Sequence, residues 1–160
     1  MSEIRCYDYV NHPYAQVRDE LSKDAPALFH AATKSAASRA RSVAAGLRVD
    51  IGIIGVETDV KISVKKIEET QSEAMSAPVT KLYIEWEAAT MASLFPLMKA
   101  ELSLYPLTST ETQLDFFGVY EPPMGALGKA VNAMVGHRIA EVSVHRFVND
   151  VAEYLRQALA

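Results

Sequence analysis

The chain has very little cysteine, since Cys6 is the only one, and a disulfide within the chain is therefore excluded. The same scarcity argues against a zinc site built from clustered cysteines. The first residues, 1–3, lack the basic region and apolar run of a secretory signal peptide. No stretch of about 18 apolar residues is free of charged residues, so no membrane span is expected. These absences together predict a protein of the reducing cytoplasm.

Positive charge is also limited, with 16 Lys and Arg against 20 Asp and Glu and a net charge of −4. Phosphate binding needs a basic face, so this balance argues against a nucleic-acid partner. One local basic cluster occurs without the interleaved aromatic residues on which bases would stack. We interpret it as the solvated face of an Ala-rich helix, in preference to a site for an anionic headgroup; its members are Lys34, Arg39, Arg41 and Arg48.

The 160 residues, 49% of them hydrophobic, fit one domain spanning 1–160 with a sizeable core. A first strand is predicted at Ile4–Val10. Asn11 and Pro13 then suit the start of a helix, which would bury Val17 and Leu21. A second helix is expected to begin near residue 24 and to continue through an Ala-rich stretch to residue 45.

Beyond residue 48 the hydrophobic period changes from helical spacing to two. Strict alternation indicates strands with one buried and one wet face, as in an antiparallel sheet. Polar residues predict a loop at 70–78, and 107–110 is expected to form a turn. The predicted strands are Val49–Ile53, Val60–Val64, Leu82–Trp86, Met98–Leu104 and Leu114–Tyr120.

One long helix is predicted from Met124 to Ala160, and its two halves differ. The C-terminal half carries an apolar stripe at helical spacing, made of Val144, Phe147, Val151, Tyr154 and Ala158. Towards the N-terminus the same face holds only small residues, Ala126, Ala133, Gly136 and Ala140. Small residues facing a sheet leave volume that large ones would fill. The opposite side is apolar as well, with Leu127, Val131, Met134, Val135 and Val142.

The segment Leu114–Pro123, followed by Gly125–Gly128, resembles the last strand, the Pro-containing turn and the small-residue helix start of START-like helix-grip proteins. That superfamily includes polyketide cyclases and lipid-binding proteins, and the resemblance in layout covers nearly the whole chain. It implies an α+β fold with a curved antiparallel sheet of about six or seven strands wrapped on a long C-terminal helix. Short helices would lie between the first two strands. The resemblance implies an apolar cavity but does not choose its ligand.

A ligand site is therefore expected between the sheet and the terminal helix. Bulky residues of the inward rows are core by default, but the small stripe opposite them favours a cavity. Its occupant would be apolar or amphipathic, such as a lipid, an isoprenoid or a polyketide-like compound. No cofactor and no metal are expected. The predicted lining is Trp86, Met98, Leu102, Phe116, Tyr120, Ala133, Gly136 and Ala140.

Two alternatives stay open. A cyclase or dehydratase on the same fold would need a general acid or base inside the cavity. The inward rows are almost wholly apolar, so no catalytic residue is predicted and enzymatic activity is left undecided. A protein-interaction module or homodimer would instead use the second apolar face, formed by Leu127, Val131, Met134 and Val135.

Two further patterns have ordinary structural explanations. His137, Glu141 and His145 share one helix face, but the two histidines are about 12 Å apart along the axis. A solvated edge with a His–Glu contact is therefore preferred to a metal site. The segment 125–129 lacks the first glycine of a phosphate loop, with Pro123 in its place, and Ala130 stands where the loop needs Ser or Thr. It is interpreted as a flexible helix start.

Overall fold

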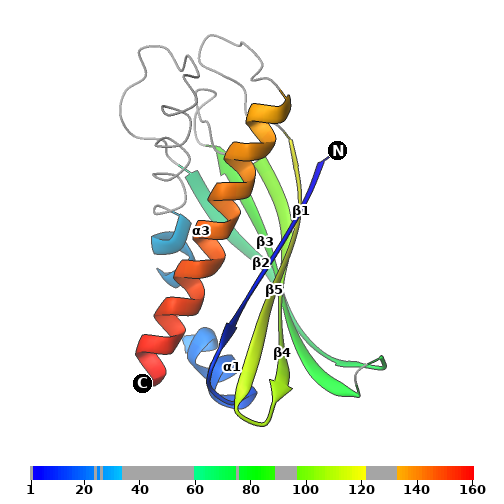
Figure 1. The fold of residues 1–160 in the computed structure, drawn as a ribbon, viewed down its shortest axis with the longest axis vertical. Coiled ribbons are helices and arrows are strands. Elements are labelled where there is room, and N and C mark those ends of the chain that lie inside the picture. Colours follow the sequence, from blue (N-terminus) through cyan, green and yellow to red (C-terminus); the bar gives the residue numbers. More distant parts are fainter. Residues whose placement is uncertain are drawn as a thin grey trace.

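The computed structural model describes residues 2–23, 25, 27–33, 60–74, 76–88, 97–121 and 133–160. A strand and a helix come first, four strands follow, and a long helix comes last (Figure 1). Residues 27–33 are also helical. The bounds are β1 Ser2–Val10, α1 Tyr14–Lys23, β2 Val60–Ser72, β3 Ala77–Ala88, β4 Leu97–Thr108, β5 Glu111–Glu121 and α3 Ala133–Leu159.

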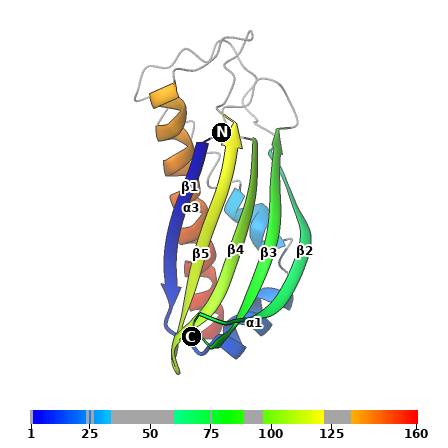
Figure 2. The same cartoon turned by 90° about the vertical axis from the view of Figure 1, so that its right-hand side faces the viewer.

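The described strands form one antiparallel sheet in the order β1-β5-β4-β3-β2. Figure 2 shows the strands side by side, with α3 and the shorter helices on one face of the sheet. The predicted α+β class, the antiparallel sheet and the long C-terminal helix are confirmed. The described sheet has five strands rather than six or seven, and the strand predicted at 49–53 lies outside the described residues.

The core lies between the inward rows of the sheet and α3. Apolar residues at every second strand position meet the apolar face of the helix, which produces one continuous cluster. Its largest fully buried side chains are Phe29, Phe116, Phe147, Leu82, Ile84, Leu102, Leu104, Leu114 and Leu155.

The predicted helix stripe is correct in its first part and wrong in its last. Val144, Phe147 and Val151 are fully buried, but Tyr154 is 45% exposed and Ala158 is exposed. Leu155 is buried in place of Tyr154. Burial follows steps of four and three residues, so the stripe passes to the neighbouring residue at this turn of the helix.

The predicted loop at 70–78 is also wrong in extent. Strand β2 continues to Ser72 and β3 begins at Ala77, and these two residues are paired. Backbone hydrogen bonds form the ladder whatever the side chains are, so polar residues at the end of a hairpin do not end it. A turn lies within the expected range 107–110 but is shorter, since β4 ends at Thr108 and β5 begins at Glu111.

The C-terminal end of α3 is fixed by polar contacts to β1. Arg156 Nη2 lies 2.7 Å from Asp8 Oδ1 and donates a 2.6 Å hydrogen bond to the carbonyl oxygen of Tyr9. Helix α1 lies at the same end (Figure 1), and its Tyr14 hydroxyl is hydrogen-bonded to the buried Thr80 hydroxyl of β3. These bonds join strands far apart in sequence to the helices.

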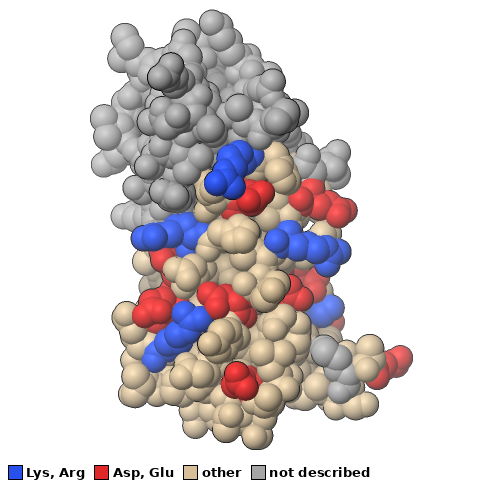
Figure 3. All heavy atoms as spheres, viewed as in Figure 1, with Lys and Arg blue, Asp and Glu red and all other residues tan. Residues whose placement is uncertain are grey.

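Among the described residues, no helix combines the length and apolar character needed to cross a membrane. Figure 3 shows Lys and Arg side chains interspersed with Asp and Glu over the described part of one face. Two ion pairs in this part of the chain join neighbouring strands of the sheet: Lys81 with Glu101 at 3.3 Å and Lys65 with Glu85 at 3.7 Å.

Candidate functional site

A row of three large side chains crosses the sheet near the ends of β3, β4 and β5. The strand register places Trp86 opposite Met98 and Met98 opposite Tyr120. All three are buried, at 2%, 3% and 2% exposure. Each of the three lies on a different strand. Strand alternation places all three side chains on the face of the sheet that carries α3. The predicted residues Trp86, Met98 and Tyr120 are therefore brought together.

Phe116 and Leu102 lie deeper in the fold. They pair with each other four residues along the strands from the Met98–Tyr120 pair, about 13 Å away at the ordinary strand rise. Phe147 of α3 approaches Phe116 with 6.1 Å between ring centroids, and Phe29 approaches Phe147 at 5.7 Å. Of the predicted lining, Phe116 is therefore packed against aromatic side chains that were not predicted to lie here.

The aromatic cluster reaches the row itself through Trp86. Its ring lies 4.9 Å from that of Phe147 in an edge-to-face arrangement and 5.7 Å from that of Phe116. Such geometry is favourable for aromatic pairs. Trp86 therefore forms the boundary between the packed aromatic cluster and the end of the sheet.

Gly118 lies between the row and the cluster on β5. A Cβ added there would come within 2.5 Å of Met98 Sδ and 2.9 Å of Phe116 Cε1. The side chains of Met98 and Phe116 thus lie over the glycine, in space that any larger residue would occupy. The missing side chain allows the row and the cluster to pack closely.

The polar part of the site is a hydrogen bond between the sheet and α3. The Tyr120 hydroxyl lies 2.6 Å from Nδ1 of His137, and Nε2 of His137 lies 3.8 Å from Oε2 of Glu141. Arg138 Nη1 holds the other carboxylate oxygen of Glu141 at 3.2 Å. Tyr120 is buried, whereas the side chain of His137 is 50% exposed. The chain of contacts thus leads from the interior to the solvent.

Sequence reasoning placed Tyr120 in the lining and His137 on a solvated edge, and it did not join them. The His–Glu contact expected along the helix is confirmed. The contact between His137 and β5 depends on the angle at which the helix crosses the sheet. That angle cannot be predicted from the spacing of residues in the sequence. The one available signal was the hydroxyl of a tyrosine in an otherwise apolar row, because a buried hydroxyl needs a partner.

On α3, Ala140 is fully buried on the face that carries Val144 and Phe147. Ala133 and Gly136 belong to the first turns of the helix, but the structure does not describe the burial of either residue. The same holds for Met134 and Val135 of the second apolar face. Other predicted features lie wholly outside the described residues: Ala126, Leu127, Val131, the segment 125–129 and the basic cluster.

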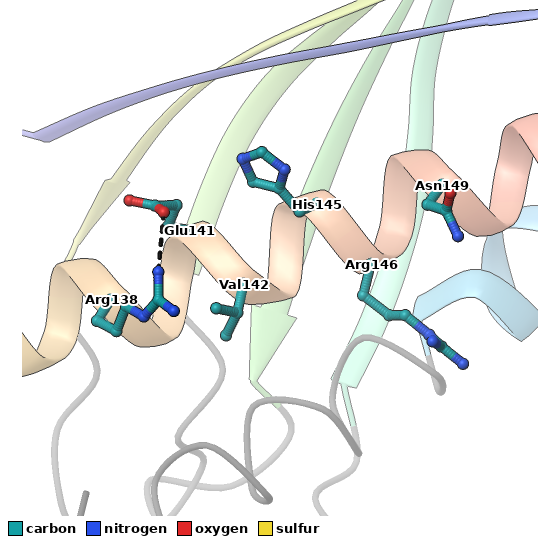
Figure 4. Close-up of a pocket in the computed structure, with 6 residues that line it drawn as sticks. All are labelled: Arg138, Glu141, Val142, His145, Arg146 and Asn149. Atoms are coloured by element: carbon teal, nitrogen blue, oxygen red, sulfur yellow. Dashed lines mark hydrogen bonds and ion pairs between the residues drawn. The ribbon is translucent and has the colours of Figure 1, made fainter.

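A concavity of about 430 Å³ lies along α3, away from the row (Figure 4). Val142, half-buried here, is the described member of the second apolar face, and it lies among polar residues. Within the described residues, no group of three or more His, Cys, Asp or Glu could hold a metal ion. The described lining is Arg138, Glu141, Val142, His145, Arg146 and Asn149.

No protein-family model and no curated protein matches this chain. Among solved structures, it is similar to a conserved protein from Geobacillus kaustophilus, with a TM-score of 0.52 and 14% identity over 98% of this chain and 97% of that one. It is also similar to the Zhui aromatase/cyclase from a Streptomyces species, with a TM-score of 0.49 and 10% identity over 99% and 96% of the two chains.

The similarity to the Geobacillus protein concerns the fold alone at this level of identity. Together with the antiparallel sheet, the early helices and α3 along one face, it shows that the chain has the helix-grip fold. The expected layout is thereby confirmed.

Proposed function

We propose that this protein binds a small apolar or amphipathic molecule between the Trp86–Met98–Tyr120 row and the N-terminal half of α3. The observation that carries the proposal is the composition of that row. It presents two large apolar side chains and ends in a buried tyrosine whose hydroxyl is bonded to His137. Ligand sites combine an apolar lining with a few placed polar groups in this way.

The small residues of α3 support the same location. By helical spacing, Gly136 and Ala133 continue the face on which Ala140 is buried. From Val144 onward that face carries larger side chains, and the aromatic cluster fills the space opposite them. The ligand site therefore combines Trp86, Met98 and Tyr120 with these small helix positions, and Leu102 and Phe116 form the support below them.

Desolvation would supply most of the binding free energy. Burial of apolar surface stabilises a complex by about 25 cal/mol per Å², before the losses of motion on association are subtracted. The Tyr120–His137 pair would contribute mainly orientation, because one hydrogen bond adds about 1 kcal/mol net. A lipid, isoprenoid or polyketide-like compound has this mixed character.

Native mass spectrometry of the freshly purified protein tests the proposal. We expect a small molecule retained in the non-denaturing spectrum and absent after denaturation. Titration with the amphipathic dye anilinonaphthalene sulfonate should also quench Trp86, the only tryptophan, in a saturable way. A bare monomer that binds no dye would contradict ligand binding. A dimer without a small molecule would favour the interaction module instead.

A cyclase or dehydratase-type enzyme is the second candidate, and the Tyr120–His137 hydrogen bond is the observation that favours it. The pair could act as a base: Tyr120 would take a proton from a ligand while its own proton passes to Nδ1 of His137. Such a base should accelerate exchange of the α-protons of naphthyl methyl ketone in deuterated buffer, followed by NMR. An exchange rate equal to that in buffer, or one unchanged in Tyr120→Phe, would contradict this role.

A further inference from the structure

The hydrogen bond between Tyr120 and His137 has a direction, and the direction limits what a ligand can offer to the tyrosine. A neutral imidazole carries one N–H and one lone pair, and its surroundings decide which nitrogen is which. The carboxylate of Glu141 lies 3.8 Å from Nε2, whereas Nδ1 lies 2.6 Å from the Tyr120 oxygen. The negative charge favours the proton on Nε2, so Nδ1 keeps the lone pair.

With its lone pair free, Nδ1 accepts the proton of the Tyr120 hydroxyl. The hydroxyl proton is then engaged in this hydrogen bond, and the hydroxyl oxygen keeps lone pairs that can accept hydrogen bonds from a ligand. Glu141 is itself held by Arg138 at 3.2 Å, which fixes the carboxylate in the position that sets this order. The contacts from Glu141 through His137 to Tyr120 thus leave the Tyr120 oxygen available to a ligand only as a hydrogen-bond acceptor.

From this geometry we propose that the polar end of the ligand site accepts a hydrogen bond, and that the protein selects apolar molecules bearing a hydroxyl or N–H group. A molecule of the same shape with only a carbonyl would meet an oxygen lone pair and pair poorly. The inference rests on the proposed ligand binding and narrows its ligand class to hydrogen-bond donors.

Calorimetric titration with three probes of similar size tests this selectivity: naphthol, which donates, naphthyl methyl ketone, which only accepts, and methylnaphthalene, which does neither. We expect the wild type to bind naphthol about fivefold more tightly than the other two, the ratio that one net hydrogen bond supplies. In Tyr120→Phe the advantage should disappear, while methylnaphthalene binds as before.

A second variant tests the direction of the hydrogen bond. In His137→Leu the Tyr120 hydroxyl loses its acceptor and can donate to a ligand, so the ketone should gain about fivefold relative to methylnaphthalene. His137 is half exposed, so the substitution replaces no fully buried side chain. Tyr105→Phe is the matched control, because the Tyr105 hydroxyl accepts from Gln113 Nε2 and both residues lie on the opposite strand face from Met98 and Tyr120.

The outcomes separate the two proposals. If none of the three probes binds the wild type, ligand binding itself fails and this inference fails with it. If all three bind equally, or the ketone binds best, ligand binding stands and the acceptor assignment is overturned. A naphthol advantage that survives Tyr120→Phe, or that Tyr105→Phe removes, would also overturn it.

Discussion

The two ends of α3 hold the sheet by different means. At the C-terminal end Phe147, Val151 and Leu155 are all fully buried, and Arg156 is bonded to β1. Towards the N-terminus, among the described residues, α3 is bonded to β5 by the hydrogen bond between the Tyr120 hydroxyl and the half-exposed His137. The difference indicates that the C-terminal turns of α3 carry most of its stabilising contacts. If the proposed ligand binds at the N-terminal turns, substitutions there should cost little folding stability.

The largest expected effect lies in the packed half. Replacing Phe147→Ala removes a ring that contacts Trp86, Phe116 and Phe29, and should lower the free energy of unfolding by about 3–5 kcal/mol. Urea melts measure this. The control is Tyr154→Ala, which should cost about 1 kcal/mol or less because Tyr154 is 45% exposed. Equal losses for the two variants would remove the distinction between the helix faces.

The alkylation rate of Cys6 tests how closed the packed half of the molecule is, because Cys6 is buried there. Burial, assisted by the negative charges of Asp8 and Asp115, raises the pKa of the Cys6 thiol from 9.0 to about 11. At about pH 8 that shift leaves about a hundredfold less thiolate, and alkylation by iodoacetamide should slow accordingly. Mass spectrometry follows the rate, with the urea-unfolded protein as reference. Equal rates in the two states would mean that this half opens freely.

A smaller effect compares two arginines of α3. Arg156, 27% exposed, bonds to Asp8 at 2.7 Å, whereas Arg138, 58% exposed, bonds to Glu141 within the same helix. Arg156→Ala should cost about 1.5–3 kcal/mol, because its bonds join two elements and are partly buried. Arg138→Ala should cost less than about 0.5 kcal/mol. Thermal melts of both variants decide this, and the reverse order would contradict the assigned anchor.

Sequence periodicity predicted the class of fold, since alternation identified at least part of each of the five described strands and helical spacing identified α1 and α3. The main difference in extent was β2, which was predicted only as far as Val64 and whose last residues, 70–72, were assigned to a loop. The local residue pattern could not show that backbone hydrogen bonds to β3 would extend β2 through these polar residues. The strand ends at Ser72, where the hairpin turn to Ala77 of β3 begins.

The site was predictable only in its apolar part. Trp86, Met98 and Tyr120 share a row because strand alternation and hairpin register follow from the sequence. The partner of Tyr120 did not follow, because a helix can cross a sheet at several angles and each brings a different side chain to the hydroxyl. The depth of Phe116 was likewise set by aromatic contacts that involve Phe29 and Phe147.

In the proposed arrangement, one end of the interface between sheet and α3 holds a ligand and the other end is filled by side chains. Two alanines of α3 offer a matched pair for it, since Ala140 and Ala152 are both fully buried. A phenylalanine at either position adds the same volume on the same helix. Only the surroundings of the two positions differ.

The most direct measurement is therefore the free energy of unfolding of Ala140→Phe and Ala152→Phe, together with dye binding by each. Ala152→Phe should overpack the filled end and cost at least about 1–3 kcal/mol, with dye binding retained in the folded fraction. Ala140→Phe should cost less than about 1 kcal/mol and abolish dye binding, because the new ring takes the ligand's place. Equal destabilisation by the two substitutions, with dye binding unchanged in Ala140→Phe, would contradict the account.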